Sequence, residues 1–550
     1  MSEEYTKHEN SDDAQLAAMG HQPELNRNFS TLSMLGLAFA VLNSWTALSA
    51  SLSLSLTSGG STGVVWGLVT AGICNLCIAA SLAEFLSAYP TKYGFFTLGL
   101  YHPSLLTAYS LLAQMGTGPV MGNGLGQRRR LGITTHSFHQ RPRSLTTYIQ
   151  VALVATNALL SSQLILGIIS ATHPDYSPQR WHQFLIYIGF TLASFVINAF
   201  LNSFLPLLYR GAFVWSIGGF VLVSITVLAC ASPDYNTAYF VFREFINETG
   251  WPDGIAWLLG LLQGGLGVTA FDAVAHMIEE IPNAALEGPK IMVICVGIGT
   301  FTGAIFLIVL LFVAGNIDEV ISSAAGPLLQ ILIHATSNTA GAICLLMLPL
   351  VCLIFATFSV MTTSSRMIFA FARDGGLPAS KFFARVHPKL GLPLNALILT
   401  SVVVIIFGLI FLGSSSAFNA IISASVVTLD LSYGLPIAVN CLQGRRKLPE
   451  RKWVLPSWFG WTADIISLSY IALTTVLFVF PPVLPVTGSN MNYCIVAFAI
   501  IIAISLFQWI IDGRKNFTGP RVNLVSGQVM GENVTEITSV EEAPGGNKEA

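Results

Sequence analysis

Residues 263–290 read QGGLGVTAFDAVAHMIEEIPNAALEGPK, and they interrupt an apolar run that begins near residue 255. Three glycines (Gly264, Gly265 and Gly267) precede an isolated acid, Asp272. Inside a bilayer every backbone polar group needs a partner, so a spanning helix breaks only where it lines a cavity or packs against protein. The stretch predicts a helix broken at mid-span, an arrangement that many secondary transporters use to build a substrate site. The alternative is an unbroken span whose glycines allow close helix packing.

The composition is that of a membrane protein. Hydrophobic residues make up 53% of the 550 residues and charged residues only 10%, whereas a soluble domain carries roughly 25% charged residues. The pair Cys74 and Cys77 has CxxC spacing but lies within an apolar run, so small packing residues are the better interpretation. We expect no metal site, no cofactor and no nucleic-acid partner.

Twelve apolar runs are long enough to cross about 30 Å of hydrocarbon as helices. They cover residues 31–56, 63–89, 147–171, 183–207, 211–232, 255–281, 291–314, 340–371, 394–412, 417–441, 462–485 and 491–511. The run 323–336 is too short to span and is expected to form a re-entrant or surface helix. Polar tails of disordered character are expected at 1–28 and 516–550, on either side of a transmembrane domain at 29–515.

The distribution of Lys and Arg predicts the orientation. If the N-terminus is cytoplasmic, the loops on the opposite side carry only Arg180 and Arg243, and the other loop cations lie inside. Both termini are therefore expected in the cytoplasm. The outer loop 233–254 contains the sequon Asn247-Glu248-Thr249, which predicts glycosylation of Asn247.

The first span contains polar residues at its middle: Asn43, Ser44, Trp45 and Thr46, followed by serines at 49, 51, 53 and 55. One interpretation is a serine-rich packing face. The other is a second broken helix, matched with the one in segment 6. Interruptions at corresponding positions of segments 1 and 6 are what an inverted repeat of five segments each predicts.

Residues 92–146 do not fit this pattern. They include GTGPVMGNGLGQRRRLGITTHSFHQRPR, which shows no hydrophobic periodicity. Long loops without structure are uncommon in a compact fold. We interpret the region as an atypical insert or a mistranslated segment.

Three stretches resemble the fungal amino acid/choline transporter family of the amino acid–polyamine–organocation superfamily. They are FSTLSMLGLAFAVLNSWTALSASLSLSLTSGG (29–60), SLAEFLSAYPT (81–91) and GLGVTAFDAVAHMIEEIPNAALEGPK (265–290), and FARDGGLP (371–378) is similar to the link between segments 8 and 9. The resemblance covers roughly 29–91 and 150–515. The sequence departs from the family pattern after Pro90, and sequence similar to that of the family returns near Val151.

The resemblance implies an all-α membrane fold of about twelve transmembrane helices, built as a five-plus-five inverted repeat with helices 1 and 6 broken. It implies a plasma-membrane permease that imports choline, γ-aminobutyrate (GABA), another amino acid or a related amine, by proton symport. The expected partners are the substrate, protons and the lipid bilayer. The alternative is a transporter-like nutrient sensor with little flux. An enzyme is not expected, because no constellation of catalytic side chains is found.

By the same resemblance, the substrate would lie between the two broken helices. The expected contact residues are Asn43, Ser44, Trp45, Thr46, Gly264, Gly265, Gly267, Thr269 and Phe271. The positive end of a half-helix would face a substrate carboxylate. The rings of Trp45 and Phe271 could face an ammonium group, or they could be packing residues.

Three further residues are structural or coupling candidates. Asp272 is an acid inside a span, which is functional by default, although an N-terminal cap for the second half of segment 6 is the preferred interpretation. His276, one turn later, would share its network. Glu84 is expected to form a gate with a basic residue of the link between segments 8 and 9, such as Arg373, or to reach solvent. Glu279 and Glu280 are interpreted as a solvated face.

Overall fold

The computed structural model describes residues 29–90 and 136–508, apart from 174, 374–376, 378, 447 and 489. For 53–54, 136–149 and most of 501–508 only the backbone is described. Both expected tails and residues 92–135 of the expected insert lie outside the described residues. Their interpretation therefore stays a prediction.

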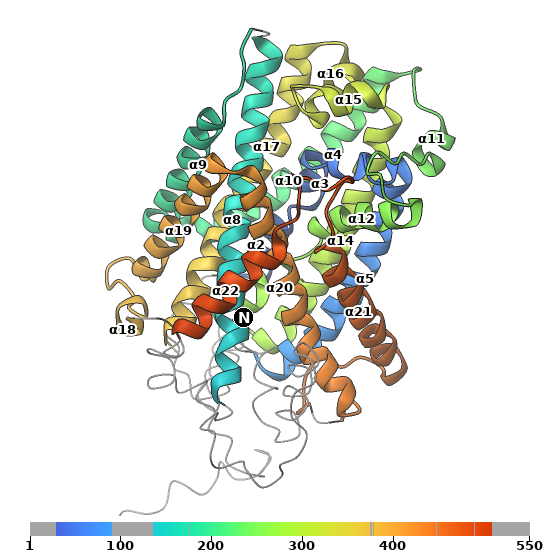
Figure 1. Ribbon diagram of the computed structural model, residues 1–550. Coiled ribbons are helices and arrows are strands. Elements are labelled where there is room, and N and C mark those ends of the chain that lie inside the picture. The colour runs from blue at the N-terminus through green and yellow to red at the C-terminus, as the bar shows by residue number, and fades with distance from the viewer. Residues whose placement is uncertain are drawn as a thin grey trace, which may run out of the picture.

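The described chain is a bundle of helices (Figure 1). The long helices are α5 (Gly60–Ala88), α8 (His136–Thr172), α9 (Arg180–Phe200), α10 (Leu205–Ala231), α14 (Ala284–Phe312), α17 (Thr339–Arg373), α19 (Leu394–Gly413), α20 (Ser415–Leu442) and α21 (Ser457–Leu477). The shorter ones are α2 (Thr31–Leu42), α3 (Ser44–Ala50), α4 (Ser53–Leu56), η2 (Asn202–Phe204), α11 (Ala238–Arg243), α12 (Asp253–Leu266), α13 (Ala273–His276), η3 (Ile278–Glu280), α15 (Ile317–Ser322), α16 (Pro327–Thr336), α18 (Ser380–Phe383) and α22 (Cys494–Gln508).

Ten of the predicted spans are long and apolar enough to cross a membrane, counting only the described residues. The first of these, Thr31–Ala50, comprises α2 and α3. The other two predicted spans are the interrupted segment 6 and α22, which has 15 described residues. The run 323–336 contains the short helix α16 (Pro327–Thr336), and its re-entrant or surface position stays a prediction. The prediction of an all-α, multi-pass membrane protein is confirmed.

Some predicted boundaries were wrong. Segment 4 was expected to reach residue 207, but α9 ends at Phe200 and α10 already begins at Leu205. Pro206 lies in the first turn of α10, where its missing N–H would have no helical partner in any case. Segment 3 was expected from 147, yet α8 begins at His136. Hydropathy marks only the apolar part of a helix, whereas its backbone hydrogen bonds continue beyond it.

The helix packing follows the predicted five-plus-five repeat. Segments 2 and 7 (α5 and α14) pack against each other, and so do segments 3 and 8 (α8 and α17) and segments 4 and 9 (α9 and α19). Each pair joins corresponding members of the two halves. The interruptions fall in segments 1 and 6, the first member of each half.

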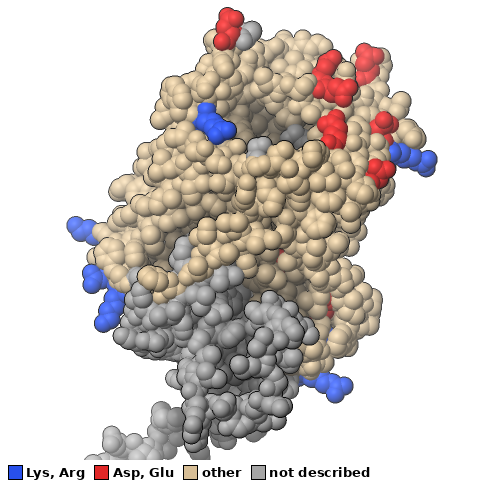
Figure 2. All heavy atoms as spheres, viewed as in Figure 1, with Lys and Arg blue, Asp and Glu red and all other residues tan. Residues whose placement is uncertain are grey.

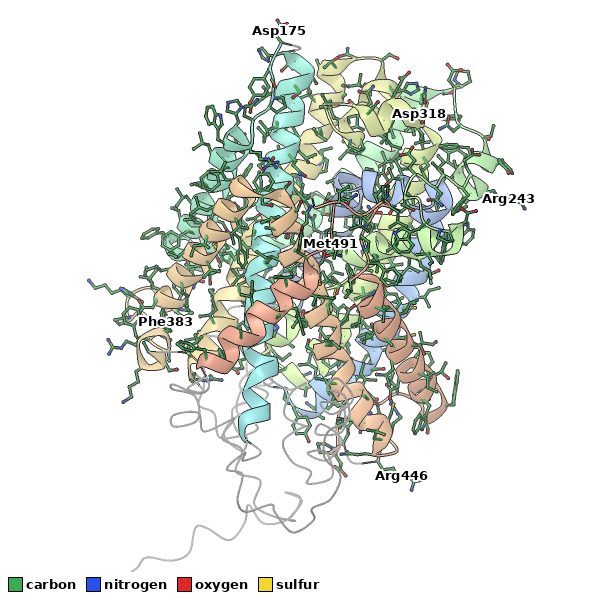
Figure 3. The ribbon with its side chains drawn as sticks, viewed as in Figure 1. Asp175, Arg243, Asp318, Phe383, Arg446 and Met491 are labelled. Atoms are coloured by element: carbon green, nitrogen blue, oxygen red, sulfur yellow. The ribbon has the colours of Figure 1, made fainter. Side chains whose placement is uncertain are left out.

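The two ends of the bundle differ in the charge of their exposed side chains (Figure 2). One end, here called the acidic end, carries the labelled Asp175 and Asp318 (Figure 3). The opposite end, here called the basic end, carries the labelled Phe383 and Arg446, with the exposed Lys381, Arg385 and Lys389 beside Phe383 in sequence. Arg243 is a cation at the acidic end.

Candidate functional site

The first break occurs at Asn43. Helix α2 ends at Leu42, Asn43 adopts the left-handed conformation (φ 47°, ψ 37°), and α3 begins at Ser44. Asparagine tolerates this conformation better than most residues. The Thr46 hydroxyl donates a hydrogen bond to the Asn43 side-chain oxygen. The predicted break in segment 1 is therefore confirmed, and it sits on a residue suited to it.

The second break, in segment 6, is longer. Helix α12 ends at Leu266, and regular helix returns only at Ala273–His276. Within this break Ala270 has a φ of 63°, a strained conformation for a residue with a Cβ and one that tends to occur at functional sites. Thr269 and Phe271 flank it and are buried. The predicted break in segment 6 is confirmed.

The glycines before this break also provide close packing, so both interpretations of them apply. A Cβ on Gly264 would lie 2.8 Å from the Cα of Leu68 on α5, which places this glycine at a helix–helix contact. A Cβ on Gly265 would lie 2.7 Å from the Tyr470 hydroxyl. Gly267 caps the C-terminus of α12.

Gln263 joins the two broken segments, a role that the sequence interpretation missed. Its Nε2 donates to the Leu48 carbonyl at 2.9 Å and to Ser51 Oγ at 3.1 Å, and its Oε1 accepts from the Ser55 hydroxyl. Two of the recurring serines of segment 1, Ser51 and Ser55, therefore do form a packing contact beyond the break at Asn43. An amide within an apolar run was the signal available in the sequence.

Buried polar side chains lie in and around the two breaks. The buried apolar side chains form two large clusters, and segment 1 contributes to both. In segment 1 the change from one cluster to the other falls between Leu42 and Trp45, at the break. Buried polar side chains of the broken segments and of the helices packed against them are here called the polar layer: Asn43, Ser44, Ser161, Ser162, Ser216, Thr269, Thr302 and Thr357. Both breaks therefore contain buried polar side chains and lie against helices that carry others.

Both candidate aromatic residues are buried. Trp45 Nε1 donates to Ser216 Oγ at 2.9 Å, and its ring meets that of Phe306 edge-on at 4.8 Å. Phe271 stacks on Tyr433 with centroids 5.1 Å apart. Trp45 is thus held against α10 and α14, while Phe271 and Tyr433 form an aromatic pair at the second break.

Asp272 does not cap the helix that follows it. It stands at the N-cap position of α13, but its side chain makes no capping hydrogen bond. Its carboxylate is 3.1 Å from His276 Nε2 and accepts a bond of 3.4 Å from Gln150 Nε2. The preferred capping interpretation was wrong, because side chains from α8 and from the next turn take the carboxylate instead. The expectation that His276 shares its network is met.

Several buried polar atoms around the two breaks have no hydrogen-bond partner among the described residues. They are Asn43 Nδ2, Ser44 Oγ, Gln150 Oε1, Thr269 Oγ1, His276 Nδ1 and the Tyr433 hydroxyl. Leaving such groups unsatisfied is costly, and native proteins leave few of them without a functional reason. Their gathering here is what a site for a small polar molecule requires.

Ion pairs tie the helices together at the basic end. Glu84 accepts from Arg445, from Arg451 Nη2 at 2.8 Å and from the Leu455 N–H at 3.0 Å. Burial disfavours the charged form of Arg445 and would lower the pKa of its guanidinium. The adjacent Asp464 and Glu84 carboxylates stabilise the charged form more strongly, so the pKa of Arg445 is raised. The expectation that Glu84 pairs with the link between segments 8 and 9 was wrong, because the loop after α20 reaches it.

Arg373 pairs with Glu279 instead, at 3.5 Å. Glu280 pairs with Arg366 at 3.3 Å, and both side chains are buried, with exposed fractions of 4% for Glu280 and 3% for Arg366. The interpretation of Glu279 and Glu280 as a solvated face was therefore wrong. Arg366, a cation inside the apolar run 340–371, was missed, although an intramembrane charge is itself a signal.

The expected glycosylation site forms a local turn at the acidic end. Asn247 Nδ2 donates to the Trp251 carbonyl at 2.7 Å, and its Oδ1 accepts from Thr249 Oγ1 at 2.7 Å. Asn247 is half-buried and Thr249 is buried. Glycosylation of Asn247 stays a prediction.

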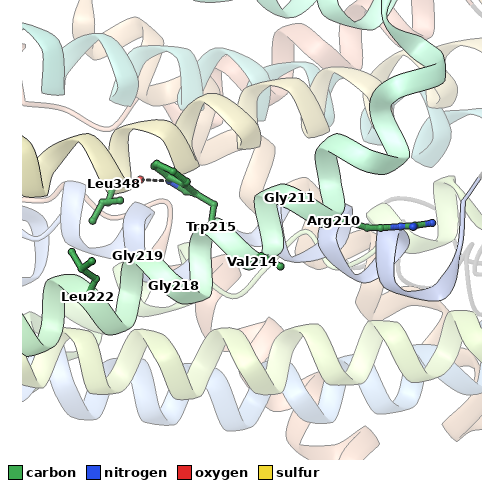
Figure 4. A pocket seen from close by; sticks show the side chains of 8 residues that line it. All are labelled: Arg210, Gly211, Val214, Trp215, Gly218, Gly219, Leu222 and Leu348. Carbon is green, nitrogen blue, oxygen red and sulfur yellow. Dashed lines mark hydrogen bonds between the residues drawn. The ribbon is translucent and has the colours of Figure 1, made fainter.

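An apolar groove of about 600 Å³ lies elsewhere, on the outer face of α10 (Figure 4). Its lining is Arg210, Gly211, Val214, Trp215, Gly218, Gly219, Leu222 and Leu348. None of the residues at either break contributes to it. Its apolar surface offers no polar group besides Arg210 and the Trp215 indole, so it is not the candidate site.

The model of the amino acid permease family matches residues 29–504. The chain is 33% identical over 497 residues to the choline transporter of Saccharomyces cerevisiae, covering 90% of this chain and 83% of that protein. It is 28% identical to an amino-acid permease of Arabidopsis thaliana (93% and 96% covered) and 28% identical to amino-acid permease 2 of Neurospora crassa (93% and 89% covered). With its two broken segments facing a buried polar layer, the chain is a transporter rather than an enzyme, and it belongs to the amino acid permease family.

Proposed function

We propose that this permease imports a small amine or amino acid, such as choline, GABA or another amino acid, across the plasma membrane by proton symport. The observation that carries the proposal is the group of unpaired polar atoms at the two breaks, including Asn43, Thr269 and Tyr433. A substrate that fills the polar layer would supply their missing hydrogen bonds.

An amine suits this site for two reasons. Asp272 offers a buried carboxylate beside the second break, and opposite charges attract strongly where water is excluded. Phe271 and Tyr433 offer aromatic rings at the same place, and ring faces attract ammonium groups by about 0.5–2 kcal/mol. The name of the yeast relative, a choline transporter, supports the same class of substrate.

The ion pairs at the basic end serve as the inner gate in this proposal. Glu84 links α5 to the loop after α20, and Arg366 links α17 to η3 of the broken segment. Movement of segment 6 away from α17 requires the bond between Arg366 and Glu280 to open. The exposed cations at this end favour a cytoplasmic position for it.

Uptake is expected to collapse when the proton gradient is removed. Cells that produce the chain should accumulate radiolabelled choline or GABA above the level of cells that lack it. Addition of a protonophore in sodium-free medium should reduce accumulation to the level of the control cells, because neither a proton gradient nor an inward sodium gradient would remain to drive it. Accumulation that persists under these conditions contradicts the proposed coupling.

Replacing residues 92–149 with the shorter link and segment start typical of the family, while keeping Gln150, is expected to preserve or raise expression and uptake. The stretch 92–146 carries five arginines and no acid, and arginines are costly within hydrocarbon. Surface expression and uptake would be measured for both forms, and the transcript compared with the gene. A transcript that contains these codons, together with loss of the full chain's activity on replacement, would contradict this interpretation.

A further inference from the structure

Asp430 is a buried acid without a cationic partner among the residues that the structure describes. It lies near the middle of α20, is 6% exposed, and accepts one hydrogen bond of 2.8 Å from Thr474 Oγ1 on α21. The other buried acids among the described residues each face a basic side chain: Glu84, Asp272, Glu279, Glu280 and Asp464. Asp430 alone has only a hydroxyl.

Two phenols connect Asp430 to the broken segment 6. The Tyr433 hydroxyl lies within electrostatic reach of both Asp430 and Asp272, and its ring stacks on Phe271. Tyr470, on α21, also feels the charge of Asp430, and its hydroxyl lies against Gly265. A change in the charge of Asp430 therefore acts on groups that contact the break on both sides of Gly267.

Among the side chains that the structure describes on the elements packed around Asp430, none is a cation that could compensate a negative charge. Helices α8, α19, α21 and α22 and the inner face of α5 surround α20. Helices α19 and α22, and α8 from Gln150 onward, contain no acidic, basic or histidine residue. The titratable groups that face Asp430 are Tyr433 on its own helix and Tyr470 on α21, with Cys74 of α5 beyond Tyr470.

We propose that Asp430 is the group that carries the transported proton and couples its movement to that of the substrate. This inference rests on the proposed proton symport. An unpaired carboxylate inside a span is unfavourable, whereas the protonated carboxyl is neutral. A proton from the outer solution forms the carboxyl O–H bond, and that bond breaks when the same proton is released to the inner solution. Tyr433 relays the resulting change of charge to Asp272 and to the break.

The test uses the full chain in proteoliposomes, with radiolabelled choline and, in parallel, GABA as probes. Asp430→Asn is expected to lose accumulation driven by an imposed pH gradient while retaining exchange of internal for external substrate at equal pH. Thr474→Val removes the hydrogen bond but keeps the acid, and it should retain pH-driven accumulation. Accumulation by Asp430→Asn at the wild-type level would overturn the inference.

The proposed function and this inference fail differently. If the unmodified chain accumulates neither probe nor any other amino acid, or accumulates one of them without need of a pH gradient, the proposed function fails first. If the unmodified chain accumulates a probe in response to the pH gradient and Asp430→Asn accumulates it equally well, the proposed function stands and the inference about Asp430 fails.

A second measurement does not depend on the folding of the variant. Dicyclohexylcarbodiimide reacts with protonated carboxyl groups in apolar surroundings, so the unmodified chain should be labelled on the peptide containing Asp430, less so as the pH rises. The labelled chain should lose gradient-driven uptake. Absence of label at Asp430 under conditions that label other buried acids would overturn the inference.

Discussion

Arg366→Met is expected to leave little folded, active transporter. The Arg366 side chain is 3% exposed, and its Nε and Nη2 donate to Glu280 and to Asn202. Methionine fills much of the same space but leaves the Glu280 carboxylate buried without its partner. Breaking a buried ion pair on one side typically costs about 3–5 kcal/mol. The thermal stability of the purified chain in detergent and its yield at the cell surface would measure the loss.

The exposed pair of Lys290 and Glu287 provides the matched control. Its N–O distance is 3.0 Å, close to that of the buried pair, but the Lys290 side chain is 41% exposed. Lys290→Met should therefore change the free energy of unfolding by less than ~1 kcal/mol. The double variant Arg366→Met/Glu280→Gln should recover part of the loss, because no buried charge is left unpaired. Wild-type stability of Arg366→Met alone would show that the pair does not hold segment 6.

The breaks could be predicted from the sequence because their causes are local. An asparagine within an apolar run at Asn43, and glycines before the polar pair Thr269 and Asp272, mark places where a helix in a membrane is interrupted. Ten spans followed from apolar length for the same reason. Local rules also account for the main error at Asp272: its position favours a cap, but Gln150 and His276 compete successfully for the carboxylate.

Partners distant in sequence could not be chosen from the sequence. Glu84 and Arg445 are separated by 361 positions. Nothing in the sequence distinguishes Arg445 from the many other cations in the predicted inner loops as a partner for Glu84. Only packing decides that the loop after α20, rather than the loop after α17, reaches α5. Arg366 and Asp430 were nevertheless detectable in principle, because a charge inside an apolar run is rare enough to mark a site.

Asp272→Asn is expected to reduce uptake strongly while leaving most of the protein folded. The capping role is absent in the structure, so asparagine removes the charge without exposing the backbone of α13. Hydrogen bonds to charged groups contribute about 1.5–3 kcal/mol, and a loss of this size in substrate or proton binding corresponds to roughly a 10- to 150-fold weaker affinity. Uptake per folded molecule, with surface expression measured in parallel, separates the two effects.

Asp253→Asn is the matched control, because Asp253 is an exposed acid at the start of α12 in the same broken segment. It should leave both uptake and expression unchanged. Loss of folded protein in Asp272→Asn, with normal uptake by the molecules that remain, would assign Asp272 a structural role through Gln150 and His276. Normal uptake together with normal expression would exclude both roles, and the positive charge of the proposed amine substrate would then have to be met by aromatic rings and neutral dipoles at the breaks.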